Sequence, residues 1–384
     1  MIATMLGTDY FRIRERFDWA LFITASLVAV VGIVNLYSAT SVYSGVRAEQ
    51  YVNQVYWLVA GGILAVFAAS IDYRHFERLG YVVYIGGVVC LILVFILGRD
   101  IRGSARWIVL GSFQFQPSEF MKLALTIALA KFLHDDPRGE SRSLKDLAIP
   151  ALLTIIPVLL ILRQPDLGTA IILMLVFFSV ASLMRLRYKS LLAFAVLVGS
   201  TVWLAWQYGL KDYQRQRVTS FLNPEADLRG AGWQAHHARV AIGNGGLFGQ
   251  GYMRGTQNQF KFLPDQYSDF PFPVFAEDWG FMGGMLLIGL YGFLSIWAIR
   301  VASQSKDRFG AVLAVGIGAM IFWQAFINLG MVLGLLPVVG VPLPLFSSGG
   351  SSVITMLIGI GLLMNVSMRR NYIAPVRRGD WLMR

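Results

Sequence analysis

The carboxylates of residues 262–281 are the first candidates for chemistry in this chain. The segment reads FLPDQYSDFPFPVFAEDWGF and holds Asp265, Asp269, Glu277 and Asp278 among aromatic residues and prolines. A positioned carboxylate can take the proton of a hydroxyl group, which turns an alcohol into a competent nucleophile. The residues that follow, MGGMLLIGLYGFLSIWAI, are almost wholly apolar and predict a membrane span. From these residues alone, a solvated or helix-capping role is the simpler interpretation of Asp269.

A second set of charges lies before and within the motif FQPSEFMKL, which leads into an apolar run. Glu119 and Lys122 are three residues apart and share one face of a predicted helix, with Ser118 as its expected N-cap. One interpretation is a local ion pair that lets a short span tolerate two charges. The other is a buried pair that holds a polar cavity open, and the two interpretations are compatible. Arg102 and Arg106 come just before this helix, where an anionic lipid headgroup would sit.

Three further segments contribute polar residues. Asp166, in LRQPDLGTA, is expected to cap the span that follows it. Residues 209–272 are too long for a simple connector and are expected to form short amphipathic helices and loops, with Arg217 and Lys261 as candidate cations. The prolines and glycines of LPVVGVPLPLFSSGGSS, residues 336–352, predict a re-entrant or capping loop instead of a continuous helix.

The elements that must position these residues are membrane spans. The chain has 384 residues, of which 56% are hydrophobic and only 14% are charged, whereas soluble domains carry about 25% charged residues. We predict an all-α integral membrane protein, a single polytopic membrane domain over residues 1–384. The pattern gives ten spans, near 19–39, 53–71, 80–98, 118–134, 147–163, 168–184, 189–208, 273–299, 309–335 and 351–368.

The distribution of Lys and Arg predicts the orientation of these spans. Most basic residues of the short joints fall on the side of the N-terminus and of the tail MRRNYIAPVRRGDWLMR. The positive-inside rule therefore places both termini in the cytoplasm and makes residues 209–272 a large extracytoplasmic loop between the seventh and eighth spans. The net charge of +11 is explained by this topology, and no basic face with interleaved aromatic residues suggests a nucleic-acid partner.

Taken in order, the motifs of this chain resemble the SEDS family (shape, elongation, division and sporulation), and more closely its rod-shape, RodA-like branch. The resemblance covers nearly the whole chain and rests on NLYSAT, RGSARWI, FQPSEFMKL, QPDLGTA, AIGNGGLFGQG, GTQ, LPDQYSDF, AEDWGF and INLGMVLGLLPVVGVPLPLFSSGGSS. It implies a ten-span glycosyltransferase in the bacterial cytoplasmic membrane that polymerises lipid II. It also implies a class B penicillin-binding protein, which crosslinks the product, and the elongation machinery as partners.

The resemblance assigns roles to individual positions. It implies that Asp269 is the catalytic residue, and we interpret it as the general base of an inverting transfer. Substrate-binding or cavity roles are expected for Arg102, Arg106, Glu119, Lys122, Asp166, Arg217, Gln257 and Lys261. A divalent cation, Mg²⁺ or Mn²⁺, is a possible cofactor for the leaving group, and no metal ligands are assigned. The alternatives are a lipid II flippase or other transporter, and a scaffold for the crosslinking partner.

The sequence departs from the family pattern near the expected base. Tyr267 and Ser268 stand where His and Thr are usual, and FPFPV replaces a run such as FIFAV. Because proline fixes φ and lacks an N–H group, we expect the eighth helix to begin around Pro273 and to leave Asp269 on the preceding loop. Glu277 and Asp278 are then expected to pair with inward-facing cations, as structural residues.

Overall fold

The computed structural model describes residues 17–45, 48–101, 104–110, 113–136, 143–184, 212–222, 231–263 and 266–369, together with 187–188, 190, 192–193, 199–200, 203 and 207. Most of the predicted seventh span, 189–208, lies outside the described residues. Arg102, Asp265 and the basic tail beyond Arg369 lie outside them as well.

The described chain is a bundle of long helices. These are α2 (Trp19–Thr40), α3 (Gln50–Ser70), α5 (Gly80–Leu97), α6 (Pro117–Asp135), α7 (Ala148–Arg163), α8 (Leu167–Ala181), α13 (Pro271–Ser303), α14 (Arg308–Val332) and α15 (Gly350–Arg369). Seven helical stretches of the described part are long and apolar enough to cross a membrane, and α8 is apolar but shorter. The predicted helical membrane fold is confirmed, while the count of ten spans stays a prediction.

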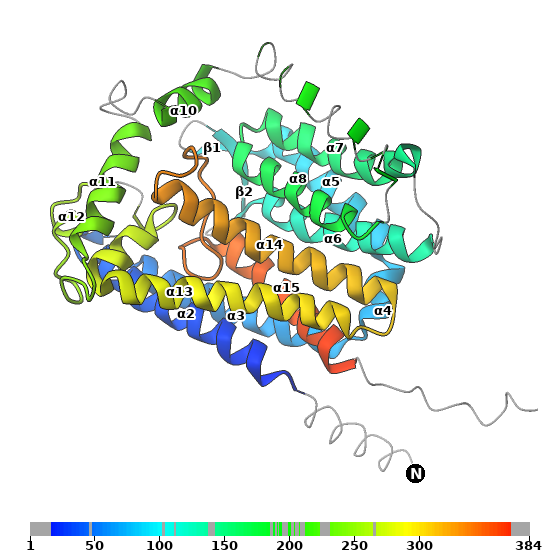
Figure 1. Ribbon diagram of the computed structural model, residues 1–384, viewed down its shortest axis with the longest axis horizontal. Coiled ribbons are helices and arrows are strands. Elements are labelled where there is room, and N and C mark those ends of the chain that lie inside the picture. Colours follow the sequence, from blue (N-terminus) through cyan, green and yellow to red (C-terminus); the bar gives the residue numbers. More distant parts are fainter. Residues whose placement is uncertain are drawn as a thin grey trace, which may run out of the picture.

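Shorter elements connect these helices or cover the ends of the bundle. They are α4 (Tyr73–Arg78), the 3₁₀ helix η2 (Leu144–Leu147), α10 (Asp212–Leu222), α11 (Ala231–Asn244) and α12 (Thr256–Gln259). The last three fall within residues 209–272, where the sequence predicts short helices and loops. Figure 1 shows α10, α11 and α12 at one end of the bundle and α4 at the other.

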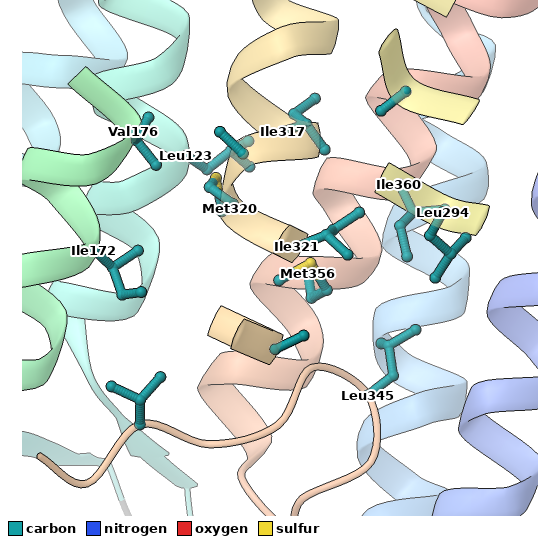
Figure 2. Packing of buried hydrophobic residues seen from close by; sticks show 14 of the residues in the cluster. Leu123, Ile172, Val176, Leu294, Ile317, Met320, Ile321, Leu345, Met356 and Ile360 are labelled. Atoms are coloured by element: carbon teal, nitrogen blue, oxygen red, sulfur yellow. The ribbon is translucent and has the colours of Figure 1, made fainter. Parts of the chain in front are cut away.

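The middle of the bundle is occupied by α14, which contacts α6 and α8 on one side and α13 and α15 on the other (Figure 1). Figure 2 shows Ile317, Met320 and Ile321 of α14 between Leu123 and Val176 on one side and helix α15 on the other. These side chains are buried, whereas large apolar side chains on α3, α5 and α7 are exposed, such as Val66, Ile96 and Leu159. Such an apolar outer surface suits a lipid environment.

A small antiparallel sheet lies between α5 and α6 and was not expected from the sequence. Its strands are β1 (Arg99–Ile101), β2 (Ser104–Leu110) and β3 (Phe113–Phe115), in the order β1-β2-β3. Two antiparallel pairings join them, β1 with β2 and β2 with β3. The signal in the sequence is the short run ARWIVL, which is rich in β-branched and aromatic residues and is followed by Gly111.

The first and last described helices meet at the end of the bundle that carries α4. Asp18 caps α2 by accepting a hydrogen bond from the Leu21 amide at 3.2 Å. The same carboxylate accepts from Trp297 Nε1 at 2.9 Å and from Ser367 Oγ at 2.6 Å. One buried carboxylate therefore joins the start of α2 to the final turns of α13 and α15, so the first and last described helices meet at one end of the bundle.

Helix α13 is broken one third of the way along its length. Gly280 has φ 69° and ψ −166°, so a short helix from Pro271 precedes the break and a long one follows it. The break frees the carbonyls of Glu277 and Asp278, which accept from the amides of Gln250 at 2.9 Å and Gly251 at 3.2 Å.

The freed amides beyond the break are satisfied by the same neighbouring loop. Phe281 and Met282 donate to the carbonyls of Gly246 at 2.8 Å and Leu247 at 3.1 Å. A Cβ atom at Gly249 would lie 2.1 Å from the Asp278 carbonyl oxygen, so the two backbones are in direct contact. The glycine-rich run AIGNGGLFGQG therefore packs its backbone directly against the break in α13. This close contact accounts for the glycines without a phosphate ligand.

The break generates a stability prediction. The conformation of Gly280 lies in a region that is essentially restricted to glycine, and a Cβ atom there would lie 2.3 Å from the Gly249 nitrogen. We expect Gly280→Ala to lower the free energy of unfolding by at least about 2–3 kcal/mol. Thermal unfolding of the purified protein in detergent measures the change.

Gly289→Ala is the matched control, because Gly289 lies in the same helix and a Cβ atom there would meet nothing within 4 Å. This control is expected to be neutral or to stabilise by up to about 1 kcal/mol. Equal unfolding temperatures for the two variants would contradict the role assigned to the break.

Candidate functional site

Asp269 lies in the turn directly before α13, on the side of the bundle that carries α10–α12. Helix α13 begins at Pro271, two residues before the expected start, and the proline takes the first helical position. Asp269 is half-buried and on the preceding turn, as predicted. Its carbonyl oxygen accepts from Asn328 Nδ2 at 2.9 Å, and the same Nδ2 donates to the Val341 carbonyl at 2.7 Å. One α14 side chain thus fixes the turn relative to the loop after α14.

The segment between α14 and α15, residues 333–349, is non-helical, which confirms the predicted interruption of the helix, and its stretch 339–347 is mostly buried. Tyr291 Oη donates to the Pro344 carbonyl at 2.6 Å, and Gln54 Nε2 donates to the Ser347 carbonyl at 3.0 Å. The Ser348 amide donates to the carbonyl of Tyr267 at 2.8 Å. Because helices α3 and α13 and the Asp269 turn all bind this loop, it forms a fixed wall beside Asp269.

Gly340 is where this wall meets the expected base. It has φ +73°, and a Cβ atom there would lie 3.2 Å from Asp269 Oδ2. The carboxylate therefore lies against the bare backbone of the loop, in space that a larger residue would narrow.

Asp166 is the N-cap of α8, as predicted, and it is also the centre of a larger cluster. Its Oδ1 accepts from the Thr169 amide at 3.2 Å, and its Oδ2 accepts from Thr169 Oγ1 at 3.0 Å. Ser118 Oγ and Gln116 Nε2 donate to the same Oδ2, each at 3.1 Å. The expectation that Ser118 caps α6 is therefore wrong, because α6 begins at Pro117 after Gln116 and Ser118 binds the neighbouring helix instead.

Arg106 completes this cluster. Its Nη1 lies 3.7 Å from Asp166 Oδ1, its Nε donates to the Gln164 carbonyl at 3.0 Å, and its Nη2 donates to the Pro165 carbonyl. The guanidinium is thus engaged by the turn between α7 and α8, where the sequence suggested an anionic headgroup. Arg102, expected to act with it, lies outside the described residues.

The loop between α14 and α15 brings the Asp166 cluster next to Asp269. A Cβ atom at Gly168 would lie 2.7 Å from Val341 Cγ2 and 3.0 Å from the Val339 carbonyl oxygen. Val339 and Val341 are the neighbours of Gly340, which touches Asp269. Two motifs that are about a hundred residues apart therefore face one short stretch of backbone.

Glu119 and Lys122 form the predicted ion pair on α6. Lys122 Nζ lies 2.7 Å from Glu119 Oε2, and the two side chains are 5% exposed for Glu119 and 2% exposed for Lys122. At such burial each charge depends on the other, because an isolated charge in a low-dielectric interior is costly.

Glu277 and Asp278 do not have the cationic partners that the sequence suggested. Glu277 Oε1 accepts from Thr256 Oγ1 and from the Gln257 amide, both at 3.1 Å. Asp278 Oδ2 accepts from Ser38 Oγ at 2.5 Å and from the Met253 amide at 3.4 Å. No ion pair to either carboxylate occurs within the described residues. Both acids instead hold the 253–257 turn against α13. Their predicted structural role is therefore kept, but hydroxyl and amide donors provide it and cations do not.

The remaining predicted residues are distributed over the outer-loop helices. Gln257 is buried, and its Oε1 lies 2.9 Å from His237 Nδ1. Lys261 is exposed, with its Nζ 5.3 Å from the centre of the Tyr43 ring. Arg217 lines a cavity between α10, α11 and the 334–338 segment. The structure thus places Arg217 beside the loop that follows α14. It pairs Gln257 with a residue of α11 and sets Lys261 near Tyr43, which follows α2.

Two residues of this region were missed by the sequence reasoning. Asn328 holds the Asp269 turn, and its signal is a polar amide inside an otherwise apolar predicted span. Arg239 lines the same cavity as Arg217. Among the described residues, no group of three or more His, Cys, Asp or Glu side chains could hold a metal ion, so the divalent cation stays a prediction.

These features define a helical integral membrane protein with a carboxylate-containing site at one end of the bundle. Comparison with known proteins gives the family: residues 18–372 match the family described as cell cycle protein, which takes in FtsW, RodA and SpoVE. The chain is 37% identical to the peptidoglycan glycosyltransferase MrdB of Escherichia coli over 341 residues, which cover 88% of this chain and 92% of that protein.

Solved structures agree with this result. One chain of a peptidoglycan synthase complex, described as coordinating polymerization and crosslinking, matches with a TM-score of 0.80 and 35% identity, covering 92% of this chain and 98% of that one. The rod shape determining protein RodA of Thermus thermophilus matches with a TM-score of 0.70 and 33% identity, covering 93% and 98%. The chain belongs to the FtsW, RodA and SpoVE family, which confirms the resemblance to SEDS proteins.

The buried ion pair of α6 generates a second stability prediction. Glu119→Gln leaves Lys122 buried without a counter-charge, and we expect it to lower the free energy of unfolding by about 3–5 kcal/mol. The double variant Glu119→Met/Lys122→Met removes both charges and is expected to lose less than half of that amount. Thermal unfolding in detergent separates the two.

The exposed pair of the same helix provides the control. Lys131 Nζ lies 3.1 Å from Asp135 Oδ2, and Asp135 is 47% exposed. Asp135→Asn is expected to change stability by less than about 1 kcal/mol. A double variant as unstable as Glu119→Gln would show that packing at this position, and not the unpaired charge, sets the cost.

Proposed function

We propose that Asp269 is the general base of this membrane protein in the polymerisation of lipid II into glycan strands. The chain is a peptidoglycan glycosyltransferase, as its relatives in the family are named. The observation that supports the residue assignment is the position of Asp269 on a half-buried turn, against the bare backbone of Gly340. A base must be within hydrogen-bond reach of a substrate hydroxyl, and a residue that is only half-buried on a turn permits that approach.

The buried carboxylates nearby have other partners. Asp166 accepts hydrogen bonds from α6 and α8, and Glu119 is paired with Lys122. Glu277 and Asp278 bind the 253–257 turn. These hydrogen bonds and the ion pair give all four carboxylates positioning roles within the protein. The proposal assigns the proton transfer to Asp269, the position that the family resemblance implies.

The proposed reaction is a single displacement. The hydroxyl oxygen of the acceptor sugar attacks the anomeric carbon of the donor, and Asp269 takes the hydroxyl proton as the glycosidic bond forms. The bond between the anomeric carbon and the lipid diphosphate breaks at the same time, and the diphosphate leaves with the bonding electrons. One carboxylate is sufficient for this step, and the configuration at the anomeric carbon is inverted.

The membrane orientation belongs to the same proposal. We infer that the end with Asp269 and α10–α12 faces outward and that both termini are cytoplasmic. The inference is supported by the hydrogen bond that joins Asp18, before α2, to Ser367, near the end of α15, and by the basic residues that neighbour both positions in the sequence. Residues 209–272 would then be the extracytoplasmic loop, within a single membrane domain over residues 1–384. The acceptor and donor would be lipid II molecules in the outer leaflet.

A class B penicillin-binding protein is the proposed partner, within the machinery that elongates the cell wall. The support is the match to a chain of a synthase complex that coordinates polymerization with crosslinking. A protein that extends glycan strands and one that crosslinks them act on the same product, so their association is chemically reasonable.

The activity generates a mutational prediction. Asp269→Asn keeps the size of the side chain but removes its basicity, so we expect glycan polymerisation from lipid II to fall by about 10²- to 10⁴-fold, with an unchanged unfolding temperature. The measurement is polymer formation by the purified protein from labelled lipid II, alone and with the partner, with and without Mg²⁺ or Mn²⁺.

Glu49→Gln is the matched control, because Glu49 is an exposed carboxylate that precedes α3 and makes no capping hydrogen bond. It is expected to retain full activity. Undiminished polymer from a folded Asp269→Asn variant would refute the base assignment. Translocation of lipid II by the wild-type protein without polymer would favour a flippase, and inactivity of the pair would favour a scaffold.

A further inference from the structure

The segment between α11 and α12 presents apolar side chains on the outside of the protein, at the Asp269 end of the bundle (Figure 1). Residues 245–252 read GGLFGQGY, and no charged residue lies between Arg239 and Arg254. Leu247 is 65% exposed and Phe248 is 81% exposed. Large apolar side chains that face water in this way are unfavourable, so their exposure calls for a partner.

The neighbouring helix extends this apolar surface. The amides of Phe281 and Met282 donate to the carbonyls of Gly246 and Leu247 at 2.8 and 3.1 Å, so the segment lies directly beside the break in α13. Both side chains of α13 are more than half exposed, and so is Leu286 one turn further along. The apolar side chains of the segment are therefore continuous with the outer surface of a helix that is long and apolar enough to cross a membrane.

The level of the segment along the bundle can be measured on two helices. Trp19 of α2 and Trp297 of α13 lie at one level, because Asp18 precedes the first and accepts a hydrogen bond from Nε1 of the second at 2.9 Å. Tryptophan is enriched at the boundary between membrane and water. Val34 is fifteen residues along α2 from Trp19, and Met282 is fifteen residues along α13 from Trp297. At 1.5 Å per residue, each separation is about 22 Å.

Both of these positions contact the segment. Tyr252 Oη donates to the Val34 carbonyl at 3.0 Å, and the Met282 amide donates to the Leu247 carbonyl. The hydrocarbon core of a bilayer is about 30 Å thick, so a level about 22 Å from one boundary is about 8 Å inside the other. The two helices run in opposite directions and give the same depth. The segment therefore lies at hydrocarbon depth, on the side of Asp269.

A non-helical segment at this depth needs partners for its backbone groups, because hydrocarbon supplies no hydrogen bonds. The Gly249 amide donates to the Gly245 carbonyl at 2.8 Å, and the amides of Gln250 and Gly251 donate to carbonyls of α13. Two carbonyls of the segment accept hydrogen bonds from α13 in return. The exposed side chain of Gln250 is paired as well, since its Nε2 donates to the Asn244 carbonyl at 2.7 Å. These pairings lower the cost of placing the segment in hydrocarbon.

We propose that residues 246–248 insert into the bilayer, where Leu247 and Phe248 contact the acyl chains of the leaflet on the Asp269 side. Under the proposed orientation this is the outer leaflet. The contact anchors the end of α11 and the break in α13 in the same leaflet, although the sequence assigns residues 209–272 to an extracytoplasmic loop. The inference involves no catalytic step, so it does not depend on the role of Asp269.

The test measures the surroundings of a single spin label in a bilayer. Cys90 is the sole cysteine of the chain, so Cys90→Ala gives a cysteine-free background. Phe248→Cys in this background is labelled with a nitroxide, and the full-length protein is placed alone in nanodiscs of phosphatidylcholine. Power-saturation EPR then compares collisions with oxygen, which concentrates in hydrocarbon, and with a polar nickel chelate, which stays in water. We expect the ratio of oxygen to nickel collisions to match that of a label introduced by Leu286→Cys on the exposed side of α13.

Phe260→Cys is the matched control, because Phe260 is an aromatic residue of the same outer region and is 68% exposed. Its neighbour Lys261 lies with Nζ 5.3 Å from the ring centre of Tyr43, which is beyond the end of α2. We expect the ratio of oxygen to nickel collisions at position 248 to exceed that at position 260 by about fivefold or more, because a polar chelate is excluded from hydrocarbon.

Leu247→Cys is the second labelled variant and is expected to give the same high ratio as Phe248→Cys. Both side chains are exposed, so their replacement is expected to leave the unfolding temperature unchanged. Ratios at 247 and 248 equal to that at 260 would place the segment in water and overturn the proposal. Loss of access to both reagents would show that protein covers these side chains, which would overturn it as well.

Discussion

Where the backbone at the Asp269 end of the bundle leaves a regular helix, its freed N–H and C=O groups need new partners, because a buried polar group without one is costly. The break of α13 at Gly280 is the clearest case. Four backbone groups freed by the break are bound by residues 246–251, two as acceptors and two as donors. The remainder of the site depends on this exchange, because it fixes the short helix that follows Asp269 and the outer loop at the same time.

The loop between α14 and α15 extends the same principle. It is non-helical, with the stretch 339–347 mostly buried, and its carbonyls accept hydrogen bonds from Gln54, Tyr291 and Asn328, which lie on three different helices. A loop held from several sides is a rigid surface, and rigid surfaces keep reactive groups in a productive geometry better than mobile ones. The Asp166 cluster, the Asp269 turn and the arginine cavity all adjoin this one segment.

Several charges of this end have structural roles. Glu119 and Lys122 neutralise each other inside the bundle, and Asp166 is surrounded by donors from α6 and α8. Such groups position helices and turns within the bundle. Asp269, the proposed base, lies outside these clusters, half-buried on the turn before α13.

The features that the sequence by itself determined are local in the chain. Apolar runs of sufficient length gave most of the spans, Asp166 was recognised as a cap from the turn before its helix, and Glu119 and Lys122 were paired by their spacing of three. The prolines before α13 left Asp269 on a turn, while its catalytic role came from the family resemblance. Each structural result follows from interactions within one or two helical turns, which residue types and spacing encode directly.

Only the tertiary structure decided which distant groups meet. The partners of Glu277 and Asp278 are hydroxyl and amide groups from residues 38 and 253–257, so the expected cations were wrong. The backbone groups freed by the break at Gly280 find their partners in residues 246–251. Arg217 and Arg239 line one cavity because α10, α11 and the loop after α14 pack around it. Long-range pairs of this kind depend on how whole helices pack, and no local pattern in the chain specifies that packing.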